Sequence, residues 1–165
     1  MALPGAASKY EQGISSDAKV VRVYRVEGRI NERIFIDESG NIDVPKVDTS
    51  PCSNNKFVQE RMLYLNFGNE GRAHRFYKQR LKQYPEDSSF SIKSFDVLES
   101  VMNQIQASAV PMHKRRFDKD QPVIADPTKN SKEGLDQFGL PPKQIEKLRE
   151  AIIPYSGKKI TKLSP

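Results

Sequence analysis

The sequence predicts an α+β fold, a single small domain in which about three helices pack on a twisted, mainly antiparallel or mixed sheet. Segments with the alternation of β-strands occur before, between and after segments with helical spacing. The 165 residues suffice for one ordinary hydrophobic core. With 36% hydrophobic and 29% charged residues, the composition is polar, yet it is too apolar for a chain that is disordered throughout.

The folded, functional domain is expected over residues 19–154. Residues 1–18 mix small and polar residues without periodicity, which predicts a flexible N-terminal segment, and residues 155–165 are expected to form a basic flexible tail. No run approaches the roughly 20 apolar residues of a membrane-spanning helix, and a classical signal peptide is not indicated. With one cysteine and two histidines, the composition excludes an internal disulfide and a Cys/His zinc site.

The first half of the chain predicts four strands. Residues 19–26 contain four valines and a tyrosine, which is typical of a strand covered on both faces, so we expect it near the centre of the sheet. Residues 33–37 and 42–44 predict a hairpin, with Gly40 supplying a positive φ in its turn. Residues 45–56 are expected to form a loop, and residues 62–67 form the fourth strand.

In the second half, helical and strand patterns alternate. An amphipathic helix with a basic exterior is expected from Asn69 to Tyr84, because its apolar residues recur at helical spacing. The pattern then predicts a strand at 90–97, a helix at 98–109, a short strand at 122–126, an irregular segment at 134–140 and a helix at 143–153.

The charge distribution indicates an anionic partner. Lysine and arginine number 27 against 21 acidic residues, so the formal charge is +6, and RNA, a nucleotide and an acidic protein all fit. The cations gather in three groups, which are Arg72, Arg75, Lys78, Arg80 and Lys82; Lys114, Arg115, Arg116 and Lys119; and Lys158, Lys159 and Lys162. A basic helix can contact RNA phosphates or serve as a solvated surface.

Two candidate anion sites lie on the first and fourth strands. Arg25 shares a face with Val21 and Val23, where its guanidinium either binds a phosphate or carboxylate or pairs with an acid such as Glu27. Asn66 and Phe67 precede Gly68 where a strand turns into a helix, and this junction either holds a phosphate or is ordinary helix capping.

Catalytic candidates are few. His74 and His113 suggest acid and base groups for RNA cleavage, or else two surface histidines. Asp136 and Gln137 form a polar cluster where either catalytic or turn residues are expected, as do the residues from Asp126 to Lys129. The sequence contains no Gly-x-Ser-x-Gly, P-loop or Gly-x-Gly-x-x-Gly motif.

Several phrases together resemble the C-terminal toxin modules of bacterial polymorphic toxins of the Rhs-repeat and contact-dependent-inhibition type. The phrases are Tyr-Arg-Val-Glu-Gly at 24–28, Leu-Tyr-Leu-Asn-Phe-Gly at 63–68 with Arg72 and Ala73, Ile-Lys-Ser-Phe-Asp-Val at 92–97, Asp126 with Thr128 and Lys129, Asp-Gln-Phe-Gly-Leu at 136–140, and Ile152 and Ile153 with Ser156 and Gly157. The resemblance implies a secreted effector that is part of a larger toxin, acts in the target-cell cytoplasm and is neutralised by an acidic immunity protein.

Among such modules, the layout is similar to ADP-ribosyltransferase-like toxins. The resemblance implies that Arg25, Asn66 and Phe67 bind NAD, with Arg25 on the phosphates and Phe67 stacked on the nicotinamide. It also implies that Gln137 holds the ribose with Asp136 or Glu27 as a helper acid. The chain departs from that family in lacking Ser-Thr-Ser at the second position and Glu-x-Glu at the third.

The resemblance leaves three functions open. The first is NAD cleavage or ADP-ribosyl transfer to RNA or protein, with NAD as substrate and with neither a metal nor a membrane. The second is RNA cleavage, because toxin ribonucleases share a similar small α+β layout and the basic charge fits them too. The third is a non-enzymatic binding module. An immunity protein is disfavoured, because such proteins are often acidic and this chain has a pI near 9.4.

Overall fold

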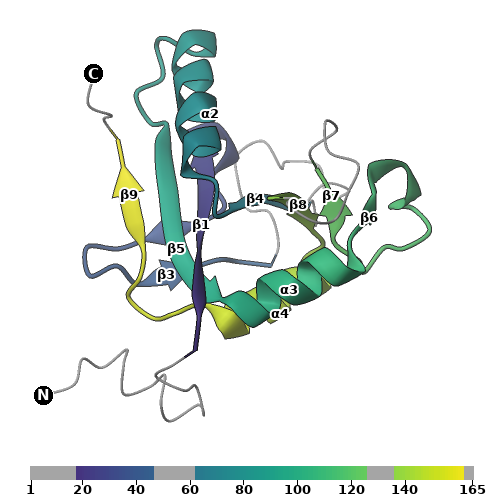
Figure 1. Cartoon of the computed structure of the whole chain (residues 1–165). Coiled ribbons are helices and arrows are strands. Elements are labelled where there is room, and N and C mark those ends of the chain that lie inside the picture. The colour runs from purple at the N-terminus through teal and green to yellow at the C-terminus, as the bar shows by residue number, and fades with distance from the viewer. Residues whose placement is uncertain (1–17, 47–61, 126–135, 162–165) are drawn as a thin grey trace, which may run out of the picture.

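The protein is described from a computed structural model, which covers residues 18–46, 62–125 and 136–161 (Figure 1). Its strands are β1 (Val20–Glu27), β2 (Phe35–Ile36), β3 (Ile42–Asp43), β4 (Leu63–Phe67), β5 (Ser91–Leu98), β6 (Val110–Pro111), β7 (Val123–Ile124), β8 (Gln137–Leu140) and β9 (Lys158–Ile160). Its α-helices are α2 (Glu70–Gln83), α3 (Glu99–Ser108) and α4 (Pro142–Ala151), and η1 (Arg29–Asn31) and η3 (Met112–Lys114) are short 3-10 turns.

The predicted α+β class is confirmed, because three helices pack on a mixed seven-stranded sheet. The strand order is β6-β7-β8-β4-β1-β5-β9, with β2 and β3 forming a separate hairpin. All pairs in the large sheet are antiparallel except β6 with β7. Strand β1 lies between β4 and β5, as its valine-rich sequence predicts.

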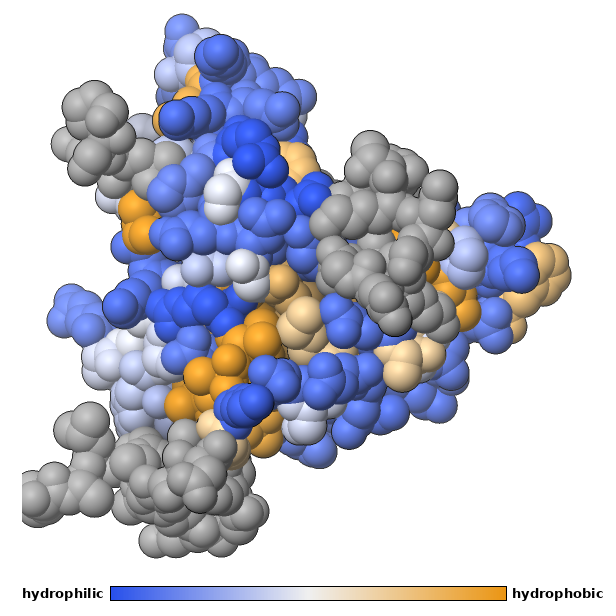
Figure 2. Space-filling view, in the orientation of Figure 1, coloured by the Kyte–Doolittle hydropathy of each residue, from blue (hydrophilic) through white to orange (hydrophobic). Residues whose placement is uncertain are grey.

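The two faces of the sheet carry two hydrophobic clusters. Val23 of β1 and Leu63, Leu65 and Phe67 of β4 belong to the larger core, which includes side chains of α3 and α4. Tyr24 and Val26 point to the other face, where they join a smaller cluster with Tyr77 of α2. Figure 1 shows α2 beside one end of β1 and β5, and the pair α3 and α4 at the other end. The exposed surface of α2 is mostly hydrophilic, as its predicted basic exterior requires (Figure 2).

Two segments differ from their predictions. The segment expected to be irregular at 134–140 contains β8, which pairs with β4 and β7, so a buried Phe138 is flanked by strands on both sides. Part of the expected flexible tail is also a strand, because Lys158–Ile160 pairs with β5. In both cases long-range pairing decides the structure, because three or four residues carry too little local signal.

The remaining predicted boundaries agree closely. The hairpin forms with Gly40 at φ 86°, although its strands are shorter than expected. Helix α2 and helix α4 begin and end within a few residues of their predicted bounds. The flexible segment expected at 1–18 lies almost entirely outside the described residues, as do most of the loop at 45–56 and the residues from Asp126 to Lys129. Across the described part of the chain, no helix combines the length and apolar character that crossing a membrane requires.

We predict that Val23→Ala lowers the free energy of unfolding by about 1–3 kcal/mol, because Val23 is fully buried at the centre of the larger core. Urea unfolding followed by circular dichroism measures the change. Val20→Ala is the matched control, since this valine lies at the start of the same strand with 43% of its surface exposed. An equal loss in both variants would contradict the central position of Val23.

Candidate functional site

A pocket of about 690 Å³ opens beside β1, β4 and α2. Cross-strand pairing brings Tyr24, Asn66 and Gln137 into one row, because Tyr24 is opposite Asn66 and Asn66 is opposite Gln137. All three line the pocket. Helix α2 contributes Phe76 and Arg80, which lie about one turn apart on the same side of the helix. The pocket is therefore assembled from segments that are distant in the sequence.

The lining combines positive charge with aromatic rings. Among the described lining residues, four are arginines and none is acidic; the arginines are Arg25, Arg33, Arg80 and Arg115. The rings are Tyr24, Tyr64 and Phe76. Desolvation raises the pKa of Tyr24, with a further contribution from the negative charge of Glu70, so its phenol stays protonated at neutral pH and can donate a hydrogen bond. This surface is suited to an anionic ligand that carries planar rings.

Arg25 lies at the pocket wall, where its guanidinium is held by the protein itself. Its Nε donates to Glu27 at 2.7 Å, and its two terminal nitrogens donate to the backbone carbonyls of Tyr64 and Asn31 at 3.1 and 3.0 Å. Two interpretations of Arg25 were open, anion binding and pairing with Glu27. The structure places Arg25 at the pocket and also shows its ion pair with Glu27. The contacts assign it a role in shaping the pocket.

Glu27 is the centre of a buried charge cluster and is not among the pocket-lining residues. Its side chain is fully buried and accepts from the backbone N–H groups of Arg33 and Ile34, both at 3.0 Å. The side chain of Lys93 is only 3% exposed, and its ammonium lies 2.6 Å from Oε1 of Glu27. Because all of these groups engage the carboxylate, Glu27 has a structural role in place of the helper-acid role expected from the resemblance.

The strand-to-helix junction is an elaborate helix cap. The side-chain amide of Asn66 accepts from the N–H of Asn69 at 2.9 Å and donates to its carbonyl. Asn69 in turn caps α2 by accepting from the N–H of Arg72. Gly68 adopts φ 87°, a conformation that glycine allows without strain. Of the two interpretations of this junction, capping is the one that these contacts show.

Neither Asp136 nor Phe67 is among the residues that line the pocket. One carboxylate oxygen of Asp136 accepts from the side chain of Asn69 at 2.7 Å, and the other lies 3.1 Å from Arg72, so Asp136 supports the start of α2. Phe67 is 2% exposed and contacts Phe138 edge-on in the larger core. It follows that Phe67 cannot stack on a nicotinamide in this pocket, and the expectation for this residue is wrong.

Gln137 remains the strongest of the expected site residues. It lines the pocket, and its side-chain oxygen is buried and has no hydrogen-bond partner within residues 18–46, 62–125 and 136–161. A buried carbonyl oxygen without a partner costs free energy that a ligand donor can recover. Gln137 is therefore the expected site residue at the pocket whose acceptor the described residues leave unused.

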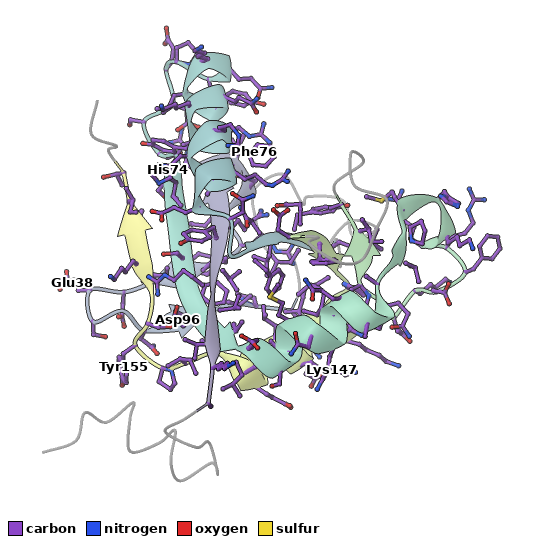
Figure 3. All side chains as sticks on the ribbon, in the orientation of Figure 1. Glu38, His74, Phe76, Asp96, Lys147 and Tyr155 are labelled. Atoms are coloured by element: carbon purple, nitrogen blue, oxygen red, sulfur yellow. The ribbon has the colours of Figure 1, made fainter. Side chains whose placement is uncertain are left out.

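The two histidines do not form a catalytic pair at this pocket. His74 and Phe76 lie on opposite sides of α2, and only Phe76 lines the pocket (Figure 3). The imidazole of His74 is 3.5 Å from Glu70, whereas His113 lies in η3 at an exposed position. The described geometry agrees with the interpretation of two surface histidines.

Sequence reasoning missed several pocket residues. Arg33, Tyr64 and Phe76 line the pocket, although the sequence did not single them out. Arg80 and Arg115 were noted only as members of basic groups. A usable signal was present in the alternation of residues 62–67, which places Tyr64 beside Asn66 on one face.

We predict that Glu27→Gln lowers the free energy of unfolding by about 3–5 kcal/mol, because it removes the fully buried negative charge 2.6 Å from Lys93 and leaves this ammonium with the partly exposed Glu32 as its acidic partner. Urea unfolding measures this effect. Glu150→Gln, at an exposed position on α4, provides the control and should change stability little. Unchanged stability in Glu27→Gln would show that the cluster is not a stabilising centre.

Comparison with known proteins does not add a relative. Scans of family models, curated proteins and solved structures each found no match to this chain. Among the described residues, no group of three or more His, Cys, Asp or Glu side chains is placed to hold a metal ion. The pocket geometry and the resemblance of the sequence phrases are therefore the two guides to function.

Proposed function

We propose that the chain is the effector domain of a bacterial polymorphic toxin and that the pocket beside α2 binds NAD as its substrate. The observation that carries this proposal is the lining itself, in which four arginines, three aromatic rings and Gln137 converge without an acidic residue among the described positions. A dinucleotide carries both features that such a lining recognises, namely a negatively charged pyrophosphate and planar bases.

Different residues are suited to different parts of NAD. Among the described residues, the guanidinium groups of Arg80 and Arg115 form exposed hydrogen bonds to Gln83 and Met112, which they can exchange for a phosphate at small cost. Phe76 is 40% exposed and offers a ring face to a base. Arg25 supports this surface through its bonds to Glu27 and to the carbonyl of Tyr64.

The proposed chemistry is cleavage of the bond between nicotinamide and ribose, with water or an acceptor taking the ADP-ribosyl group. Positive charge develops on the ribose as this bond breaks, and in this proposal the side-chain oxygen of Gln137 turns toward the ribose to supply negative partial charge. A neutral amide stabilises that charge less than a carboxylate does, so we expect slow turnover. Asp136 and Glu27 are not assigned catalytic roles, because other residues of the chain engage both carboxylates.

RNA is the second candidate substrate, favoured by one specific observation. Arg115, at the pocket, belongs to an exposed segment that also carries Lys114, Arg116 and Lys119, so positive charge extends beyond the space that a single nucleotide occupies. Cleavage by His74 and His113 is not part of this proposal, because neither histidine lines the pocket. An acidic immunity protein remains the proposed protein partner in both cases, since it would cover a basic surface.

We predict that controlled expression of the chain inside a bacterium arrests growth and that Gln137→Ala relieves the arrest at equal soluble expression. The reason is that Gln137 lines the pocket and that the described part of the chain offers its side-chain oxygen no hydrogen-bond partner. Growth curves and immunoblots measure both quantities. Coexpression of an immunity gene encoded beside the toxin should restore growth, whereas normal growth at high soluble expression of the unaltered chain would count against the toxin proposal.

We predict that purified protein binds NAD and that Arg80→Ala weakens the affinity about tenfold or more, as expected on losing a charged hydrogen bond to phosphate. Phe76→Ala should also weaken binding, because it removes a ring from the lining. Isothermal titration calorimetry measures affinity, and released nicotinamide measures cleavage.

Lys82→Ala is the matched control for these titrations. It removes an exposed cation from the same helix without altering the pocket lining. Equal affinities in Arg80→Ala and Lys82→Ala, or no heat of binding with the unaltered chain, would rule out this pocket as an NAD site.

A further inference from the structure

The segment between β6 and β7 projects from the sheet as an exposed arm. Residues 111–120 are all exposed, and we call residues 112–120 the basic arm. Figure 1 shows the chain turning here, beyond the end of the sheet that carries β6 and β7. Phe117 is 79% exposed, well above the other exposed large hydrophobic residues of the described chain. An aromatic side chain that is almost wholly in water makes little contribution to folding, so a binding role is a natural explanation.

The arm has a defined backbone structure despite its exposure. Its base is closed by the parallel pairing of Val110 with Val123, and successive turns are held by hydrogen bonds from the N–H of Phe117 to the carbonyl of Lys114 and from Gln121 to Asp118. At the C-terminal end of the arm, Asp120 contacts α4 in two ways. Its carboxylate lies 3.1 Å from the ammonium of Lys143, and its backbone carbonyl accepts a hydrogen bond from the side chain of Gln144. Such an arm presents its side chains at little further ordering cost.

The charged residues of the arm flank Phe117 in the sequence. Lys114, Arg115, Arg116 and Lys119 are positive, while Asp118 and Asp120 are negative. The pairing of Asp120 with Lys143 offsets one of these negative charges. Figure 2 shows hydrophilic and hydrophobic surface side by side on this projection. An aromatic ring among cations is the combination that binds single-stranded nucleic acid, because bases stack on the ring while cations contact the phosphates.

The arm is also continuous with the pocket. Arg115 belongs to the arm by sequence and to the pocket by position. The pocket lining then continues the same chemistry with Arg33 and Arg80 and with the rings of Tyr24 and Phe76. A strand lying on the arm would therefore be directed toward the pocket by cations and rings of the same kind.

We propose that the basic arm binds single-stranded nucleic acid, with one base stacked on Phe117, neighbouring phosphates on Arg116 and Lys119, and Arg115 leading the strand toward the pocket. This inference goes beyond the proposed function, because it requires no turnover of NAD. In the NAD proposal the strand is an acceptor, and in the RNA proposal it is the substrate. Binding to the arm precedes either reaction and is measured separately.

Fluorescence anisotropy with short labelled oligonucleotides of mixed sequence tests the proposal. The probes are single-stranded DNA, 2′-O-methyl RNA, in which cleavage through the 2′-hydroxyl is blocked, and a duplex of the same sequence. Phe117→Ala should weaken single-strand binding by about 5- to 150-fold, the range expected on losing one stacked base. Phe117→Trp should retain binding, whereas Phe117→Leu should lose it as Phe117→Ala does, because stacking requires a ring. The position is 79% exposed, so all three variants are expected to fold.

The salt dependence tests the charged half of the proposal. Arg116→Ala should reduce the slope of log affinity against log salt concentration by about 0.7, corresponding to one phosphate contact on a single strand. Lys147→Ala is the control, since it removes an exposed cation from α4 outside the arm and should leave both slope and affinity unchanged (Figure 3).

Three results would overturn the proposal. The first is equal single-strand affinity in Phe117→Ala and the unaltered chain, and the second is equal losses in Arg116→Ala and Lys147→Ala. The third is flotation with vesicles of phosphatidylcholine and phosphatidylserine that depends on Phe117 while oligonucleotide affinity does not, which would assign the arm to a membrane surface. A failure to bind NAD with intact oligonucleotide binding would overturn the proposed function and leave the arm proposal standing.

Discussion

The buried carboxylate of Glu27 is the interaction on which the surrounding structure depends. It accepts from Arg25 on its own strand, from the N–H groups of Arg33 and Ile34, and faces the ammonium of Lys93 on β5. A lone buried charge costs several kcal/mol, so these partners must all be in place for the carboxylate to remain inside. One side chain thereby joins β1, β5 and the segment that leads into the β2–β3 hairpin.

The same cluster accounts for the opening of the pocket. Strand β1 pairs with β5 over eight residue pairs but with β4 over only two, the last of which is Tyr24 with Asn66. Beyond that pair, the guanidinium of Arg25, held by Glu27, donates to the carbonyl of Tyr64, so a side chain bridges the two strands there. Because β1 and β4 no longer form a ladder at this point, space is left between them for a ligand.

One face of the sheet carries most of the hydrophobic core, and the other face carries the pocket. The face covered by α3 and α4 is built from fully buried apolar side chains such as Phe95, Phe138 and Leu148. The face that carries α2 has a smaller cluster around Tyr77 and, beside it, the polar row of Tyr24, Asn66 and Gln137. The smaller cluster uses only a few side chains of α2, such as Tyr77. Phe76 and Arg80 of the same helix can therefore line the pocket.

Periodicity alone was sufficient for the elements with strong local patterns. The valines of β1, the alternation of β4 and β5 and the apolar stripes of α2, α3 and α4 predicted the α+β class, because burial of one face imposes a period on the sequence. The sequence also predicted the positive φ of Gly40 and the pairing of Arg25 with Glu27 as one of two interpretations.

Tertiary structure decided everything that depends on residues distant in the sequence. Strands β8 and β9 are too short to carry a local signal. They form because β4 and β5 each offer an edge with which they can pair. The burial of Lys93 follows from its neighbours, since no local pattern reveals that an ammonium will meet a carboxylate. The alternation of β4 places Phe67 on the same face as Leu65, but only the folded sheet shows that this face belongs to the core and not to the pocket. The chain-wide positive charge was evident from composition, but only folding brought Arg33, Arg80 and Arg115 to one pocket, because charges far apart in the sequence converge solely through the pairing of strands and the packing of helices.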